Sequence, residues 1–527
     1  MTVRKIRKFL AVGIRLLVLS FAISATEAAA QAEPGCSLEA IPELPDVAIT
    51  SVGHEAAPAP HCRVVGVIGT ETNFELLLPD DWNGKFVMGG GGGFVGSVVN
   101  IALLYGPLQS GYATVGTDTG HPGHSLDASW ALNNLERVVS FGHQAVHRTA
   151  VTSQSLISIY YGRDSSRDYF IGCSRGGGQA LMEAQRYPED FDGIVAGAPA
   201  YNWTHELGAR NTWINQAMYP DPDDLSVAVI GPEQTQLIGN AVLERCDGLD
   251  GLEDDILNNP LLCDFDVSSL ACRNRETDGC LTDQQVAAAK RIYDDLYIQG
   301  KRIFPGYPVG GELSPFGWNL WLTGGLDLVP DVEDFQEGAV TVSEFSAPVT
   351  PNAHHAFGNG VMKYLVYHDP EWNYADYTFE TFEADVATVG PTLNATNPDL
   401  SAFREHGGKL LLHNGWADMA LTPLGTIEYY EQVLARDASA AEDVRLLLLP
   451  GVDHCAGGVG PSFVHMLNAI DRWVETGDAP EQLTAYWLDE QNQTDGSRPV
   501  CAYPSWLKYN GSGDPREASS FSCVNPN

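Results

Sequence analysis

Basic residues are scarce in this sequence. The 527 residues include 30 lysines and arginines against 68 aspartates and glutamates, which gives a formal net charge of −38 at pH 7. Proteins bind nucleic acids largely by neutralising phosphates with cationic side chains, so we expect no nucleic-acid partner. An acidic surface of this kind favours solubility, but it specifies neither a fold nor a substrate.

Long apolar runs are also few, and beyond the N-terminus none is apolar enough to span a bilayer. The first 30 residues hold a basic start, an apolar core at 16–25 and three alanines at 28–30. This order is typical of a signal peptide and predicts a secreted or periplasmic protein that has no membrane attachment after cleavage. A membrane anchor is the alternative, disfavoured because the apolar core is shorter than the ~20 residues that a spanning helix needs.

The ten cysteines are an even number, which fits five disulfides in an oxidising compartment. Two of them flank residues with possible chemistry, because Cys173 precedes Ser174 and Cys455 follows His454. If these two are bonded, the Cα atoms of the serine and the histidine lie within roughly 15 Å of each other. Spacing alone does not establish connectivity, but it suggests four local pairs: Cys36 with Cys62, Cys246 with Cys263, Cys272 with Cys280, and Cys501 with Cys523.

Secondary-structure signals divide the chain into three parts. Strand-like and helix-like runs alternate from 64 to 200, a pattern that predicts a parallel α/β sheet. Residues 205–405 lose the alternation, and strand-like runs return at 409–413 and 444–449. The length after the leader exceeds what one hydrophobic core usually organises. We therefore predict an α/β domain built from 31–204 and 406–527, with 205–405 inserted into it.

A candidate nucleophile lies between a predicted strand at 168–171 and a predicted helix that begins near 177. The sequence there is Gly172-Cys173-Ser174-Arg175-Gly176. A nucleophile elbow requires this strand-turn-helix context, with small residues that permit a strained turn. The Gly-x-Ser-x-Gly pattern by itself is weak, since about 0.3 matches are expected by chance in a chain of this composition.

Asp418 and His454 complete the order serine, acid, histidine that α/β-hydrolases share. Each follows a predicted strand, where α/β sheets place their functional groups. His454 would accept the Ser174 proton and return it to the leaving alcohol, while Asp418 orients the imidazole. Asp453 is the rival acid, but it directly precedes His454 and would rarely reach the Nδ1 atom. A loop carboxylate and a structural histidine are the alternatives without catalytic roles.

Five consecutive glycines at 89–93 follow a predicted strand at 85–88. They allow the backbone to approach a ligand closely, as an oxyanion hole requires. We expect one N–H donor from Gly91 or Gly92 and the other from Arg175, directly after the nucleophile. A flexible loop is the alternative, and a phosphate loop is disfavoured because no Gly-Lys-Ser/Thr follows.

An acidic loop lies between Cys246 and Cys263 in the inserted segment. It offers an all-oxygen ligand set of the kind that Ca²⁺ prefers, although it does not match the EF-hand pattern. We expect a structural ion, and an acidic solvated turn is the alternative. The predicted ligands are the carboxylates of Asp247, Asp250 and Asp254 and the carbonyls of Leu252 and Ile256.

Taken together, Cys173-Ser174, Asp418 and His454-Cys455 resemble the cysteine-flanked triad of the tannase and feruloyl esterase family of α/β-hydrolases. The resemblance covers nearly the whole chain after the leader, and the family includes bacterial members that hydrolyse mono(2-hydroxyethyl) terephthalate. It implies the triad, oxyanion and calcium roles given above. It also implies that 205–405 is a lid that closes over the aromatic acid part of an ester.

We therefore predict a secreted serine carboxylic ester hydrolase that acts on esters of aromatic acids, of feruloyl, galloyl or terephthaloyl type, through an acyl-enzyme on Ser174. The alternatives are specific hydrolysis of mono(2-hydroxyethyl) terephthalate, an amidase or peptidase, and a catalytically silent binding protein. A terephthalate half-ester would need a cation, for which Lys363 is a candidate. Six aromatic residues are candidate ring walls, although such residues are more often core: Trp318, Trp321, Phe357, Tyr364, Tyr367 and Trp372.

Overall fold

The computed structural model describes residues 35–98, 106–273, 278–324 and 351–525. The predicted signal peptide at 1–30 lies outside these residues, and the chain from Cys36 onward forms one unit. Across the described ranges, every helix is too short or too polar to traverse a lipid bilayer.

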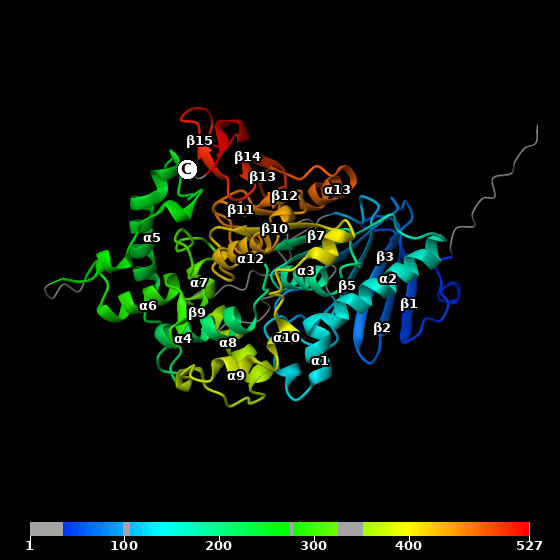
Figure 1. Cartoon of the computed structure of the whole chain (residues 1–527), viewed down its shortest axis with the longest axis horizontal. Helices are drawn as coiled ribbons and strands as arrows, with labels where there is room; N and C mark the ends of the chain where they lie inside the picture. Colours follow the sequence, from blue (N-terminus) through cyan, green and yellow to red (C-terminus); the bar gives the residue numbers. More distant parts are fainter. Residues whose placement is uncertain (1–34, 99–105, 274–277, 325–350, 526–527) are drawn as a thin grey trace, which may run out of the picture. The chain divides into compact units, whose positions relative to one another are not determined.

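A nine-stranded mixed sheet forms the centre of this unit, with its first strands in blue at one edge in Figure 1. In hydrogen-bonding order the strands are β1 (Val47–Glu55), β2 (His61–Ile68), β3 (Thr72–Pro79), β5 (Ala113–Thr117), β4 (Lys85–Gly89), β6 (Arg167–Cys173), β7 (Gly193–Gly197), β10 (Lys409–Gly415) and β11 (Val444–Leu449). The pairings from β1 to β5 are antiparallel, and those from β5 to β11 are parallel. This arrangement confirms the predicted α/β class.

Alternate strand residues pack on opposite faces of the sheet, as the two-residue period of a strand requires. Met88, Phe170 and Leu412 belong to one hydrophobic cluster, and their neighbours belong to another on the opposite face. The first cluster includes residues of α2 (Ala145–Tyr161), α3 (Arg175–Arg186) and α12 (Pro423–Arg436), and the second includes residues of α13 (Met466–Thr476). Both faces are covered, which is why the parallel strands are nearly continuous runs of buried residues.

A C-terminal extension packs against the α13 side of the sheet, because Ala485 and Val500 belong to the same cluster as α13. It contains β12 (Phe463–Val464), β13 (Gln482–Leu488), β14 (Thr494–Cys501), β15 (Trp506–Tyr509) and β16 (Phe521–Val524). The disulfide Cys501–Cys523 joins β14 to β16.

The predicted insertion leaves the sheet after β7 and returns at β10, two strands that pair directly with each other. It appears in green and yellow in Figure 1 and contributes no strand to the large sheet. Its own core includes Trp318, Leu322 and Val361. The domain limits at 204 and 406 stay a prediction.

The helices and strands of the insertion are α4 (Asn211–Met218), α5 (Pro232–Cys246), α6 (Asp283–Tyr293), β8 (Leu296–Ile298), β9 (Lys301–Phe304), α7 (Trp318–Trp321), α8 (Ala353–Gly360), α9 (Phe382–Val386), α10 (Gly390–Leu393) and α11 (Ser401–Glu405).

Several of the remaining helices are π-helices or short. The π-helices are η4 (Ser140–Gln144), which lies between α1 (Leu135–Val139) and α2, η5 (Thr204–Arg210), which runs into α4, and η11 (Val361–Val366), which follows α8. A π-helix turn inside a longer helix is rare and frequently marks a functional site.

One carboxylate ties the sheet to α13. Asp471 accepts hydrogen bonds from the Lys85 ammonium at 2.6 Å, the Tyr169 hydroxyl at 2.5 Å and the Tyr112 hydroxyl at 3.0 Å. These donors come from β4, from β6 and from just before β5. Burial opposes the charge on Asp471, but the Lys85 and Tyr169 hydrogen bonds outweigh it and lower the pKa of the carboxyl.

We predict that Asp471→Asn lowers the free energy of unfolding by about 2 kcal/mol, because it removes the charge that pairs with a largely buried lysine. Urea denaturation would measure this change. Asp478→Asn, at an exposed position just beyond α13, is the matched control and should change stability by less than about 0.5 kcal/mol. Equal stabilities of the two variants would contradict the assigned role of Asp471.

Candidate active site

Ser174 occupies the sharp turn between the end of β6 and the start of α3. Its backbone has φ 61° and ψ −123°, a conformation that is strained for any residue with a side chain. The turn is possible because its neighbours are glycines. A Cβ on Gly172 would lie 2.4 Å from the Gly176 backbone, and one on Gly90 would lie 2.6 Å from the Gly176 Cα. The local geometry is therefore that of a nucleophile elbow.

Asp418 and His454 are hydrogen-bonded to each other, with 2.8 Å between Asp418 Oδ2 and His454 Nδ1. Asp418 is completely buried, and its Oδ1 accepts hydrogen bonds from the N–H groups of Ala420 at 2.8 Å and Leu421 at 3.0 Å. The carboxylate is thus fixed by its own loop and directed at the imidazole. This is the arrangement that orients a general-base histidine.

Asp453, the rival acid, accepts hydrogen bonds from a different part of the chain. Its carboxylate oxygens bind the Ser314 hydroxyl and, at 3.2 Å, the Phe316 N–H, both of which belong to the insertion. Burial raises the pKa of Asp453 to about 7. Asp453 therefore anchors the insertion to the histidine loop.

The disulfide between Cys173 and Cys455 joins the elbow to the histidine loop, with 5.9 Å between the two Cα atoms. Adding one peptide step at each end places the Ser174 and His454 Cα atoms at most about 13.5 Å apart. The four local pairs that spacing suggested are also bonded, and all cysteines in the described part of the chain are in disulfides.

The glycine run only partly meets the expectation for an oxyanion hole. The Gly91 N–H already donates to the Gln179 side-chain oxygen at 3.0 Å, so Gly91 would have to break this bond to serve a substrate. The Gly91 N–H is thus occupied in this structure, which favours Gly92, and both glycines stay predictions for the oxyanion donor. The sequence shows the glycines, but it does not show that the Gln179 side chain, on α3, reaches the Gly91 N–H.

The Arg175 side chain does not face a substrate. Its guanidinium lies 4.2 Å from the Phe141 ring centroid, and it donates to the Phe141 carbonyl and, at 3.0 Å, to the Gly142 carbonyl in η4. Burial lowers the pKa of Arg175 to about 9. The backbone N–H of Arg175 begins α3, where N–H groups lack intrahelical partners and the helix dipole favours negative charge. Its predicted oxyanion role thus involves the backbone.

Three buried residues of the insertion hold the loop that carries Asp418. Glu206 accepts from the Thr422 N–H at 2.9 Å, the Tyr307 hydroxyl donates to the Ala420 carbonyl at 3.0 Å, and His354 Nε2 lies 2.8 Å from the Met419 carbonyl. Burial raises the pKa of Glu206 well above its ordinary value. Sequence reasoning missed all three, and no local pattern distinguishes them from other polar residues of the insertion.

One of the six candidate ring-wall residues lies beside the histidine, and a second stacks on it. Trp321 meets the His454 ring edge-to-face at 5.3 Å between centroids, and Phe357 stacks on Trp321 at 6.2 Å. The other four pack within the insertion. Trp318 is fully buried against Tyr293, Tyr367 and Trp372 stack on each other, and Tyr364 packs on the insertion core.

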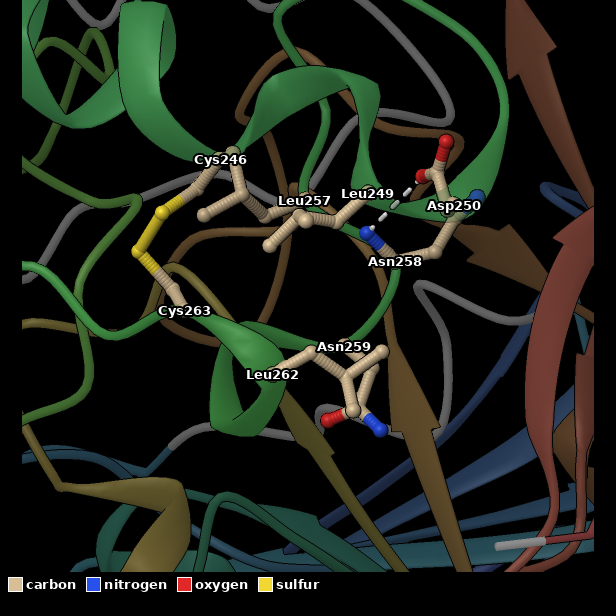
Figure 2. A pocket seen from close by; sticks show the side chains of 8 residues that line it. All are labelled: Cys246, Leu249, Asp250, Leu257, Asn258, Asn259, Leu262 and Cys263. Atoms are coloured by element: carbon tan, nitrogen blue, oxygen red, sulfur yellow. Dashed lines mark hydrogen bonds between the residues drawn. A yellow bond between two sulfur atoms is a disulfide. The ribbon is translucent and has the colours of Figure 1, made fainter. Parts of the chain in front are cut away.

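The predicted calcium loop follows Cys246, whose disulfide to Cys263 lies beside a small pocket (Figure 2). Asp250 accepts from the N–H groups of Leu252 at 3.0 Å and Asn258 at 3.3 Å. Oδ1 of Asp247 and Oδ1 of Asp254 are buried without a hydrogen-bond partner, as expected of oxygens that bind a cation. Burial also raises the pKa of Asp250 to about 6, a cost that a bound cation would remove.

Other features of this loop fit a cation less well. The second oxygen of Asp254 binds the Arg498 guanidinium. The three aspartates are also not among the acid and histidine groups whose ligand atoms approach within 4.8 Å of one another in the described ranges. Calcium binding here stays a prediction that the two unpartnered oxygens favour.

Comparison with known proteins identifies the family. A family model described as "Tannase and feruloyl esterase" matches residues 58–524. An uncharacterized esterase of Xanthomonas campestris pv. campestris is 31% identical over 98% of this chain and 94% of its own length. The mono(2-hydroxyethyl) terephthalate hydrolase of Piscinibacter sakaiensis is 30% identical over 92% and 89%. The crystal structure of feruloyl esterase B from Aspergillus oryzae superposes with a TM-score of 0.79 at 25% identity, over 93% of this chain and 99% of that one. The chain therefore belongs to the tannase and feruloyl esterase family and is a carboxylic ester hydrolase with an α/β-hydrolase fold.

Proposed function

We propose that this protein is a secreted serine esterase that cleaves esters of aromatic acids through an acyl-enzyme on Ser174. One observation carries the proposal: a disulfide ties the strained turn at Ser174 to the loop of His454, whose ring is held by buried Asp418. A strained serine, a buried acid and a histidine, in that chain order, make up the hydrolytic apparatus of α/β-hydrolases. The fully bonded cysteines support an oxidising compartment.

In the proposed reaction, His454 Nε2 takes the proton of the Ser174 hydroxyl as its oxygen attacks the ester carbonyl. The negative charge on the carbonyl oxygen is stabilised by the N–H groups of Arg175 and Gly92. His454 then gives the proton to the departing alcohol. A water molecule, deprotonated by His454, attacks the acyl-enzyme and releases the acid and the free serine. Asp418 keeps the Nδ1 proton in place throughout.

The position of Trp321 supports an aromatic acyl group. Its ring contacts His454 and stacks on Phe357, so an acid whose carbonyl is at Ser174 would place its ring near two flat apolar surfaces. Feruloyl, galloyl and terephthaloyl esters share this feature. Terephthalate monoester hydrolysis is the second candidate, favoured by the relative from Piscinibacter sakaiensis. Lys363, the cation predicted for the free carboxylate, lies in η11, which directly follows α8.

We expect the purified protein to hydrolyse at least one of methyl gallate, methyl ferulate, methyl p-coumarate and mono(2-hydroxyethyl) terephthalate. Ser174→Ala should lower kcat by more than about 10³-fold, because it removes the nucleophile. Product release followed by chromatography measures this. Ser155→Ala, at an exposed serine of α2, is the control and should retain full activity. An unchanged rate in Ser174→Ala would refute the acyl-enzyme, and comparable turnover of the matching amides would indicate an amidase.

We expect the double variant Cys173→Ala/Cys455→Ala to lose turnover even where it still folds, because nothing covalent then relates the elbow to the histidine loop. The bond spans 282 residues, so the chain-entropy model predicts a stability loss of more than about 4 kcal/mol. Cys272→Ala/Cys280→Ala, which opens a bond across only 8 residues, is the matched control. It should keep kcat within about twofold, and equal kcat losses in both double variants would contradict a specific catalytic role.

Removal of bound metal with the chelator EGTA should lower the melting temperature by several degrees and added Ca²⁺ should restore it, while kcat at low temperature changes little. The reason is that the loop is separate in sequence from every triad residue. Asp247→Asn should reproduce the lower melting temperature and make it insensitive to added Ca²⁺. A melting curve that EGTA leaves unmoved would show that the loop binds no calcium.

A further inference from the structure

Three potential ligands come together far from the proposed catalytic residues. They are His147 on α2, Glu183 on α3 and Asp190 in the turn between α3 and β7. One ligand atom from each lies within 4.8 Å of the other two, a group that stands alone among the acids, histidines and cysteines of the described ranges. His147 Nδ1 and Asp190 Oδ2 are 2.6 Å apart.

Glu183 is the member that needs explanation. It is 0% exposed, and among the described residues no N–H or O–H group donates to either carboxylate oxygen; the Asp190 carboxylate reaches hydrogen-bond distance only for a form in which the pair shares a proton. Burial and the adjacent Asp190 raise the pKa of Glu183 well above its ordinary value. Arg186, the cation one helical turn away, donates instead to the Pro391 carbonyl. A buried carboxylate without donors must be neutralised by a proton or by a cation.

The neighbouring groups hold the cluster in place but do not supply a positive charge to Glu183. The Tyr187 ring stacks on His147 with 3.8 Å between centroids, and Gln154 Nε2 donates to the Asp190 carbonyl at 2.9 Å. The His147 side chain is 31% exposed, while Asp190 is 10% exposed. The cluster is thus buried on the carboxylate side and open to solvent on the imidazole side.

We propose that His147, Glu183 and Asp190 bind a divalent transition-metal ion of the zinc class. Imidazole nitrogen and carboxylate oxygen are both Zn²⁺ ligands, and three protein ligands leave a fourth position open to water through the exposed side of His147. Tetrahedral ligands on Zn²⁺ lie about 3.4 Å apart, which small side-chain rotations would achieve from the present spacing. The nitrogen ligand distinguishes this ion from Ca²⁺ and Mg²⁺, which prefer oxygen.

The site lies at the opposite end of the parallel strands from Ser174. Asp190 precedes β7, whereas Ser174 follows β6, and Glu183 lies nine positions after Ser174, about 13 Å along the axis of α3. An ion here would join α2, α3 and the entry to β7. Coordination requires the deprotonated form of each ligand, so metal binding should weaken as the pH falls. The inference does not depend on the proposed substrate.

The test is a Co²⁺ titration of the full-length protein after metal removal, followed by visible absorption. Co²⁺ in a low-coordinate site with a nitrogen ligand gives strong d–d bands, whereas an all-oxygen calcium loop does not favour such a geometry. We expect one equivalent of Co²⁺ to produce the bands, Zn²⁺ to abolish them by competition, and Zn²⁺ to raise the melting temperature by several degrees.

Two ligand variants and a matched control make the result specific. His147→Gln and Glu183→Gln should lose the bands and the thermal shift. His143→Gln should keep both, because His143 lies one turn before His147 but faces the Tyr187 hydroxyl at 2.7 Å. Ester hydrolysis should stay within about twofold in all three, which separates this test from that of the triad.

The wild-type protein alone can overturn the proposal, even if a variant fails to fold. Absence of Co²⁺ bands and of a Zn²⁺-dependent shift would mean that Glu183 is neutralised by a proton shared with Asp190. Bands that persist in folded His147→Gln would mean that Co²⁺ binds elsewhere, and would equally refute the site.

Discussion

The covalent bond between Cys173 and Cys455 is the constraint on which the arrangement of the site depends. In the parallel sheet β6 and β11 are separated by β7 and β10, so no backbone pairing connects the serine turn with the histidine loop. The disulfide makes that connection directly, one residue from each functional side chain. Because interiors are close-packed, a displacement of either loop would have to move the other as well. The elbow itself is strained, and strained turns persist only where the surroundings over-determine them.

The insertion supports the site. It reaches the acid loop through Glu206, Tyr307 and His354, and it reaches the histidine loop through Ser314 and Asp453. These contacts are buried hydrogen bonds between segments that are distant in sequence, and losing either partner of such a bond is more costly than the bond's net contribution. The geometry of the hydrolytic apparatus therefore depends on how the insertion packs.

The buried carboxylates of this acidic chain differ in how many hydrogen-bond donors stabilise them. Asp418 is held by two backbone N–H groups and the imidazole, and Asp453 by a hydroxyl and one N–H. Glu206 accepts a bond from one backbone N–H. Glu183 lies at the end of this series, completely buried and without a donor. Desolvation of a charge must be compensated locally, so the carboxylate with the fewest donors is the one at which an external cation or proton is expected.

Local patterns in the sequence were sufficient for the framework. The alternation of strands and helices indicated the α/β class, the spacing of eight cysteines indicated the local disulfides, and the strand ends indicated Ser174, Asp418 and His454. The fold class and the disulfides are confirmed, and the predicted triad residues lie at strand ends as expected, because each pattern depends on residues close in sequence or on the chain order of the fold. Asp418 was preferred to Asp453 by the same local reasoning, since a residue adjacent to a histidine rarely reaches its ring.

Only the tertiary structure decided which side chains occupy the space around these residues. Gln179 takes the Gly91 N–H, η4 and Phe141 hold the Arg175 side chain, and Trp321, rather than Trp318, meets the histidine. The hydrogen bond from the Thr422 N–H to Glu206 and the cluster at Glu183 likewise join residues from separate elements. Such contacts carry no periodicity or motif, because they depend on how whole elements pack against each other. The sequence by itself determined the class of chemistry and its order along the chain, whereas packing over long separations determined the donors, the ring walls and the buried charges.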